Sequence, residues 1–266
     1  MTDSNGKVSL VGAGPGAPDL ITVRGQRALE RADVVLYDRL VHPDLVDDLD
    51  AELVYVGKRS GEKRITQERI NALMVELAGG GEEVVRLKGG DPTVFGRGSE
   101  EMLHLREHGI DCEIIPGISS STAAASRADI PVTHRGYADS FAVVTAHRAG
   151  DAEDLSIPPY DPKRTLMLLM GVGTMELWRQ QLLEAGYPED LPVAFVQRAS
   201  WEDQKTVVTS LENCVMHARD AGLEPPATAV VGRVVAVRSA LESLEQQAES
   251  VEPRPVDIAE IGERQP

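Results

Sequence analysis

The first half of the chain alternates short apolar runs with amphipathic stretches. The apolar runs predict strands near residues 8–11, 33–37, 53–56, 84–87 and 112–115. Between them, helices are predicted near residues 23–32, 66–78 and 99–108. This regular alternation of strand and helix is typical of a mostly parallel sheet with helices on both faces.

In the second half, predicted strands also follow one another directly. They lie near residues 140–145, 165–170, 193–197, 205–209 and 227–231, and helices are expected near 119–128, 174–185, 211–221 and 237–247. Because direct strand-to-strand connections favour antiparallel pairs, we expect a second, mixed sheet. The sequence thus predicts an α/β protein with domains at residues 1–116 and 117–248. Residues 249–266 contain prolines but no hydrophobic period, so we expect a disordered tail there.

Composition restricts the possible partners. The chain has 266 residues, of which 42% are hydrophobic and only 4% aromatic, so the core is expected to be aliphatic. A net charge of −16 argues against nucleic acid or an anionic membrane as the main partner. No apolar run approaches membrane-span length, and residues 1–7 are too polar for a signal segment. The two cysteines have no metal or redox spacing, which fits a cytoplasmic protein.

The basic residues are unevenly chosen. Only six of the 27 are lysines, and the rest are arginines. An acidic, lysine-poor chain is typical of a halophilic protein, and the alternative is an ordinary acidic cytosolic enzyme.

The most distinctive segment, residues 86–101, reads RLKGGDPTVFGRGSEE. Gly89 and Gly90 allow a sharp turn with no Cβ between the backbone and a ligand. Pro92 biases Asp91 towards an extended conformation. The segment therefore predicts a strand, a ligand-binding loop with a carboxylate and a guanidinium, and a helix start. The alternative is an ordinary strand-to-helix connection.

A second glycine-rich loop, GAGPGAPD at residues 12–19, follows the first predicted strand. Its glycines, with Asp38 further on, satisfy a degenerate dinucleotide fingerprint. That fingerprint needs a helix to start within the glycines, and Pro15 and Pro18 interrupt this position. The first plausible N-cap is Thr22. A nicotinamide or flavin site is therefore disfavoured.

Taken together, these loops resemble motifs of the tetrapyrrole methylases that use S-adenosylmethionine (SAM). The closest pattern is that of uroporphyrinogen-III C-methyltransferases, R-L-K-G-G-D-P-F-x-F-G-R-G-x-E-E. Seven motifs in the family's order cover about residues 8–244, including YDRLV at 37–41, PGI at 116–118, IPVTHR at 130–135 and PAT at 226–228. The chain departs at Thr93 and Leu169, where the family has aromatics, and at residues 197–200, where QRAS stands for E-N-G-T.

The resemblance implies that SAM binds in the cleft between the two domains. Its implied contacts are Pro15, Gly89, Gly90, Asp91, Val94, Ser119, Ser120, Met170, Ala199, Ala227 and Thr228. By residue type alone, the two serines also fit as helix caps and Met170 as a filler of the core. Asp91 either fixes its loop or contacts a polar group of the cofactor.

The resemblance also implies roles in chemistry. Asp38 would accept a proton and Lys58 would donate one; the alternatives are a turn carboxylate, a solvated lysine, or a positioning ion pair. Arg97 and Arg135 would bind substrate carboxylates, because guanidinium pairs with carboxylate in bidentate fashion. Glu100 would orient Arg97 from one helical turn away. His134 is interpreted as a surface histidine.

The implied reaction is two methyl transfers from SAM to C2 and C7 of uroporphyrinogen III. It would give precorrin-2 through precorrin-1 and release S-adenosylhomocysteine, within sirohaem and cobalamin synthesis. A sulfonium methyl is already activated, so no metal is expected. The family also implies a homodimer. Two alternatives stay open: another methylase of this fold, acting on a later corrinoid precursor or as a diphthine synthase, and a non-catalytic nucleotide-binding module.

Overall fold

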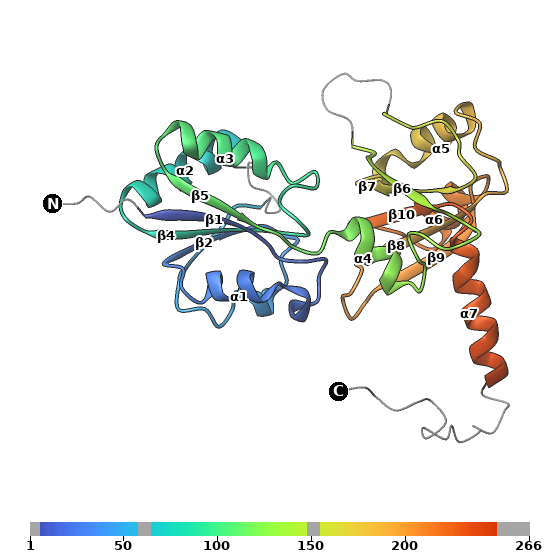
Figure 1. The fold of residues 1–266 in the computed structure, drawn as a ribbon, viewed down its shortest axis with the longest axis horizontal. Helices are drawn as coiled ribbons and strands as arrows, with labels where there is room; N and C mark the ends of the chain where they lie inside the picture. Colours follow the sequence, from blue (N-terminus) through green and yellow to red (C-terminus); the bar gives the residue numbers. More distant parts are fainter. Residues whose placement is uncertain (1–5, 58–64, 148–154, 249–266) are drawn as a thin grey trace, which may run out of the picture.

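The chain folds into two lobes, each built on one five-stranded sheet (Figure 1). The structure is a computed structural model that describes residues 6–57, 65–147 and 155–248. The segment between the last strand of the first sheet and the first helix of the second lobe joins the two (Figure 1). Within those three ranges, no helix combines the length and the apolar character that a membrane crossing requires.

The first sheet is entirely parallel, with strand order β3-β2-β4-β1-β5. Its strands are β1 (Lys7–Gly12), β2 (Val34–Tyr37), β3 (Glu52–Tyr55), β4 (Glu83–Lys88) and β5 (Asp111–Ile115). Helices α2 (Gln67–Gly79) and α3 (Gly98–Glu107) cover one face, and α1 (Val23–Leu29) covers the other (Figure 1). Because every pair is parallel, all five strands end at one edge of the sheet, where ligand sites of such sheets form.

Alternation along the strands explains why both faces carry helices. In β1, Val8 and Leu10 join the core under α2 and α3, while Val11 joins the core over α1. The starts of α1 and α2 are set by hydroxyl caps. Thr22 Oγ1 accepts the backbone N–H of Gly25 at 3.1 Å, which confirms the predicted N-cap of α1.

The second sheet is mixed, as predicted, with order β6-β7-β10-β8-β9. Strands β6 (Ser140–Thr145) and β7 (Arg164–Leu169) are parallel. The antiparallel pairs involve β8 (Pro192–Gln197), β9 (Lys205–Ser210) and β10 (Ala227–Val231). Helices α5 (Met175–Glu184) and α6 (Cys214–Asp220) pack on one face, and α4 (Ser120–Arg127) and α7 (Val235–Ala248) on the other.

The predicted elements are all present, with small shifts at their ends. Met170 was predicted to end a strand, but it lies just beyond β7 in the left-handed region, at φ 59°, and is 49% exposed. The strand ends there because the chain turns into Gly171, the residue that precedes a short 3-10 helix, η3 (Val172–Thr174). The domain boundary after residue 116 falls between β5 and α4 and stays a prediction. The predicted tail at 249–266 lies outside the described residues.

The excess of acidic residues predicts that salt stabilises the fold. With a net charge of −16, carboxylate repulsion opposes folding. This repulsion acts across a whole domain at low ionic strength, where the Debye length is about 30 Å, but only between neighbours in molar salt. We expect the melting temperature to rise through KCl concentrations of about 0.05, 0.5 and 2 M. A flat or falling series would indicate an ordinary acidic protein.

Candidate active site

Four loops meet at the carboxyl edge of the first sheet. They follow β1, β2, β4 and β5, and they contain the GAGPGAPD loop, Asp38, the Gly89–Gly90–Asp91 turn and the Pro116–Gly117 turn. The strand order places the ends of β2 and β5 on either side of β4 and β1. Loops separated by up to a hundred residues in the sequence are thereby side by side.

The backbones of three glycines, Gly12, Gly90 and Gly117, pack against one another in the centre of this edge. Gly14 and Gly90 form a two-residue antiparallel bridge, with N–H to carbonyl distances of 3.2 and 2.7 Å. A Cβ on Gly117 would lie 2.2 Å from the Gly90 carbonyl oxygen and 2.7 Å from the Gly12 Cα. No side chain fits at Gly117, so glycine is required for the loops to meet.

Gly90 faces the start of α4. It adopts φ +71°, and a Cβ there would have its nearest neighbours, Ser119 Cα and Ser120 N, 3.9 Å away. Ser119 caps α4 by accepting the backbone N–H of Ser121 at 3.2 Å, so the helix-cap interpretation of this serine describes an observed contact. A Cβ on Gly90 would therefore be in ordinary van der Waals contact with the start of α4.

The Asp91 carboxylate fixes the loop. Its Oδ2 accepts the backbone N–H of Gly117 at 3.0 Å, and its Oδ1 accepts the backbone N–H of Thr93 at 2.7 Å. Thr93 also donates its hydroxyl to Oδ1. The threonine that replaces the family's aromatic residue therefore adds a hydrogen bond to the turn. Of the two roles left open for Asp91, fixing the loop is the one with observed contacts. Val94 lies in the same turn, where its backbone N–H donates to the carbonyl oxygen of Asp91.

The loop between β8 and β9 of the second lobe contacts the first lobe. Ala17 donates its backbone N–H to Ser200 Oγ at 2.9 Å, and the ring of Trp201 lies 4.5 Å from that of His42. A Cβ on Gly16 would lie 2.8 Å from the carbonyl oxygen of Ala199. Pro15 and Ala199, both predicted cofactor contacts, are thereby brought to the same junction.

Strand register places the remaining cofactor candidates of the second lobe near Ala199. Because β10 is antiparallel to both neighbours, Thr228 pairs with Leu169 of β7 and with Val196 of β8. The start of β10 therefore lies at the sheet edge where β7 and β8 end. Ala227, Thr228, Met170 and Ala199 share this edge.

Asp38 stands at the end of β2 with a half-buried side chain. Its Oδ1 accepts the backbone N–H of Leu40 at 3.0 Å, which is the turn contact considered above. Its Oδ2 lies 3.4 Å from Nη2 of the buried Arg86. The carboxylate is thus held from two sides while part of it stays accessible.

Arg86 belongs to a buried charge cluster that sequence reasoning missed. The cluster consists of Asp38, Arg86, Lys88 and Glu101. Glu101 is fully buried and accepts hydrogen bonds from Lys88 Nζ at 2.9 Å to each oxygen. Burial lowers the pKa of Lys88, the nearby Arg86 charge adds to this, and Glu101 opposes it. The available signal in the sequence was two cations, Arg86 and Lys88, at alternate positions after an apolar run. If such a strand is buried, its cations require a buried anion.

The predicted substrate residues lie at the surface. Arg97 donates from Nε and Nη2 to Glu100 Oε2, at 3.0 and 2.6 Å, and the two side chains are 50% and 56% exposed. The hydrogen bond from Arg97 lowers the pKa of Glu100. Arg135 is exposed in the turn between His134 and Ala138. Lys58 lies outside the described residues.

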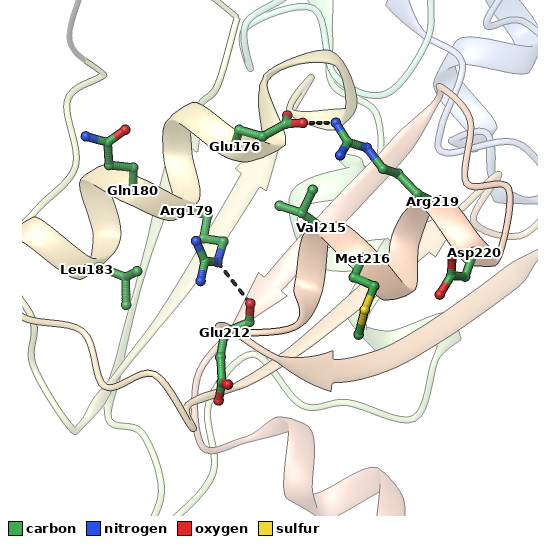
Figure 2. A pocket seen from close by; sticks show the side chains of 9 residues that line it. All are labelled: Glu176, Arg179, Gln180, Leu183, Glu212, Val215, Met216, Arg219 and Asp220. Carbon is green, nitrogen blue, oxygen red and sulfur yellow. Dashed lines mark hydrogen bonds and ion pairs between the residues drawn. The ribbon is translucent and has the colours of Figure 1, made fainter.

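A large groove exists elsewhere on the second lobe, between α5 and α6 (Figure 2). It has a volume of about 660 Å³, and none of the predicted site residues lines it. Glu176 pairs with Arg219, and Arg179 Nε donates to the backbone carbonyl oxygen of Glu212 (Figure 2). Arg179 Nε also donates to the carbonyl oxygen of Leu211.

Comparison with known proteins decides the family. The family described as Tetrapyrrole (Corrin/Porphyrin) Methylases matches residues 7–214. The chain belongs to the tetrapyrrole methylase family. A uroporphyrinogen-III C-methyltransferase of Methanocaldococcus jannaschii is 46% identical over 239 residues, covering 87% of this chain and 98% of that one. Siroheme synthase 1 of Halorhodospira halophila is 45% identical over 247 residues. This match covers 92% of the present chain but only 51% of the relative's length. The chain thus spans about half the length of several curated relatives that it matches.

Solved structures agree with this placement. The crystal structure of uroporphyrin-III-C-methyltransferase from Thermus thermophilus matches with a TM-score of 0.77 and 42% identity, over 89% of this methylase and 98% of that chain. A second structure of that protein, complexed with S-adenyl homocysteine, matches with a TM-score of 0.72 and 39% identity, over 87% and 94%. A diphthine synthase matches at 21% identity, which shows the shared fold alone.

The glycine packing of this methylase generates a prediction. Gly117→Ala puts a methyl group 2.2 Å from the Gly90 carbonyl oxygen, so the loops around Gly90 must move apart. We expect S-adenosylhomocysteine to bind at least about tenfold more weakly by calorimetry, a loss of about 1.4 kcal/mol. Gly79→Ala is the matched control, because a Cβ there meets nothing within 4 Å. Equal affinity of both variants would mean that the packing of the three glycines does not shape the binding site.

Proposed function

We propose that this protein is a uroporphyrinogen-III C-methyltransferase. It methylates C2 and then C7 of uroporphyrinogen III, giving precorrin-2 through precorrin-1, and so supplies sirohaem and cobalamin synthesis. The observation that carries the proposal is the meeting of the Gly90 loop, the start of α4 and the Ala199 loop at one junction. The full-length match to a relative of that name supports the same substrate.

The residues at the junction fit SAM. When bound, SAM supplies a methyl group already activated by its sulfonium. Gly90 and the neighbouring Ser119 and Ser120 would offer backbone and hydroxyl groups to its polar parts. Pro15, Gly89, Asp91 and Val94 would complete the first-lobe side, and Met170, Ala199, Ala227 and Thr228 the second-lobe side. Their common task is to exclude water and hold the reactants in line.

Proton transfer is assigned to Asp38 and Lys58. Methylation of a ring carbon leaves a proton to be removed, and a positioned carboxylate can take it. Asp38 has this position at the carboxyl edge, with one oxygen on the Leu40 amide and the other facing Arg86. Lys58 would return a proton to the substrate.

Substrate charge explains the surface arginines. Uroporphyrinogen III carries eight carboxylates, so a protein with a net charge of −16 must concentrate positive charge locally. Arg97 and Arg135 would do this at the exposed rim of the site. Glu100 holds the Arg97 guanidinium through two hydrogen bonds and would keep it oriented for a carboxylate.

The direct test is product formation. Purified protein is incubated anaerobically with SAM and uroporphyrinogen III, and the product is identified by mass. The proposal predicts a product heavier by two methylene units, formed only when SAM is present. A methylase for a later corrinoid precursor or for a protein histidine derivative would leave this substrate unchanged. A non-catalytic module would also leave it unchanged and would bind NAD as readily as SAM.

Arg97→Ala tests whether the substrate and the cofactor are bound by different residues of the site. The loss of a carboxylate contact should raise the KM for uroporphyrinogen III by at least about tenfold, or 1.4 kcal/mol. Affinity for S-adenosylhomocysteine should change by less than about twofold. Arg69→Ala removes another exposed arginine, which lies 3.7 Å from Glu76 on α2, and serves as control. This assignment of Arg97 is wrong if Arg97→Ala weakens the binding of S-adenosylhomocysteine and leaves the KM for uroporphyrinogen III unchanged.

We also propose a homodimer that acts in the cytoplasm. The dimer is supported by family resemblance alone. The cytoplasm is supported by two buried cysteines that are not joined in a disulfide, as expected in a reducing compartment. Light scattering at micromolar concentration should report twice the mass of the chain. A monomer under those conditions would refute the dimer.

A further inference from the structure

We infer that Glu101 is a positioning residue for methyl transfer: its buried carboxylate sets the orientation of Arg86, and through it the position of Asp38. The inference rests on the proposed function, because Asp38 is the group assigned to proton removal. Its evidence is a continuous series of alternating charges, Lys88, Glu101, Arg86 and Asp38, of which Asp38 is the accessible member.

Glu101 is anchored from several elements at once. Lys88 of β4 donates to both of its oxygens at 2.9 Å, and Gln67 at the start of α2 donates to Oε1 at 3.0 Å. Gln67 in turn donates to Asn71 Oδ1 at 2.9 Å. A carboxylate held by a strand and a neighbouring helix has little freedom to turn, so it acts as a fixed negative point beneath the sheet edge.

Arg86 is oriented by what surrounds its three nitrogens. Its Nη1 donates to the carbonyl oxygens of Leu36 and Leu87, at 3.3 and 2.9 Å. Its Nη2 faces Asp38 Oδ2 at 3.4 Å. Its Nε is buried, makes no hydrogen bond, and lies 3.5 Å from Glu101 Oε1. Attraction to Glu101 therefore holds the end of the guanidinium that hydrogen bonds leave free.

The exposure of the four side chains indicates which of them a substrate can contact. The side chain of Asp38 is 26% exposed, whereas those of Arg86, Lys88 and Glu101 are exposed by 7% or less. A substrate can touch only the Asp38 end. The three buried members therefore act on the reaction through Asp38 or not at all.

The negative charge of Glu101 is needed to balance the two buried cations, Arg86 and Lys88. The cluster has two cations and two anions, so it is neutral as a whole. Without the Glu101 charge, Arg86 and Lys88 are two buried cations that share the single carboxylate of Asp38. Both would then be drawn towards that carboxylate, which changes the place from which it meets the substrate.

The main test compares Glu101→Gln with Glu107→Gln. Gln keeps the shape of the side chain and removes its charge, and Glu107 is an exposed residue at the end of the same helix. Glu101→Gln should lower kcat at least about tenfold and change the KM for uroporphyrinogen III and the affinity for S-adenosylhomocysteine by less than about twofold. Glu107→Gln should change none of the three. A normal kcat for Glu101→Gln, or equal losses in all three quantities, would overturn the inference.

A coupling experiment separates positioning from general damage. Asp38→Glu keeps a carboxylate base but moves it by the length of one methylene. The position that Arg86 gives to the carboxylate is therefore already lost in this variant. Adding Glu101→Gln to this variant should then lower kcat by less than about twofold. A loss by the same factor as in the wild-type background would show that Glu101 acts independently of Asp38 and would refute the inference.

If Glu101→Gln does not fold, the pair can be removed together. Lys88→Met with Glu101→Leu replaces both charges by apolar groups of similar volume, which buried ion pairs often tolerate. This variant should bind S-adenosylhomocysteine normally and still show the loss of kcat, because the Nε end of Arg86 has lost the Glu101 carboxylate. A normal kcat would contradict the inference. A wild-type protein that forms no product would instead contradict the proposed function.

Discussion

The buried ion pair between Lys88 and Glu101 ties the two ends of the most distinctive segment of the chain together. Lys88 ends β4 and Glu101 lies in the first turn of α3, so their contact closes the loop that carries Gly89, Gly90 and Asp91. Breaking a buried pair by removing one partner costs about 3–5 kcal/mol, because the other charge is left unpaired. The loop is therefore fixed at its base by electrostatics and at its tip by the Asp91 carboxylate.

The tip of this loop makes the contacts at the junction of the lobes. The Gly90 backbone pairs with Gly14 of the first glycine loop, and the Asp91 carboxylate binds the amide of Gly117 just before α4. Since α4 packs on the second sheet, the same contacts orient the second lobe. The Ser200 hydroxyl on the Ala17 amide adds a second tie. Cofactor contacts from both lobes thus depend on the tip of this loop, which the Asp91 carboxylate holds through the backbone amides of Gly117 and Thr93.

Much of this could be predicted from the sequence because aliphatic runs and glycine turns act locally. The strands are short apolar runs bounded by turns, and strand alternation with helices fixes a parallel sheet. The loops at 12–19 and 89–98 were recognisable because only glycine permits backbones to approach so closely. Their resemblance to methylase motifs indicated the cofactor, which the comparisons support.

What the sequence concealed depends on three-dimensional neighbours. Glu100 and Glu101 are adjacent and identical, yet one is exposed beside Arg97 and the other is fully buried beneath β4. Only the rotation of α3 against the sheet distinguishes them. In the sequence, Thr93 is only a departure from the family's aromatic residue, and its hydrogen bond to Asp91 becomes visible only in the folded turn.

The most direct test of the proposed cofactor site is a crystal structure of the protein with S-adenosylhomocysteine. We predict that the ligand contacts the Gly89–Gly90–Asp91 turn of the first lobe, Ser119 and the Ala199 loop of the second lobe. A ligand bound in the groove between α5 and α6, or touching one lobe alone, would contradict the account.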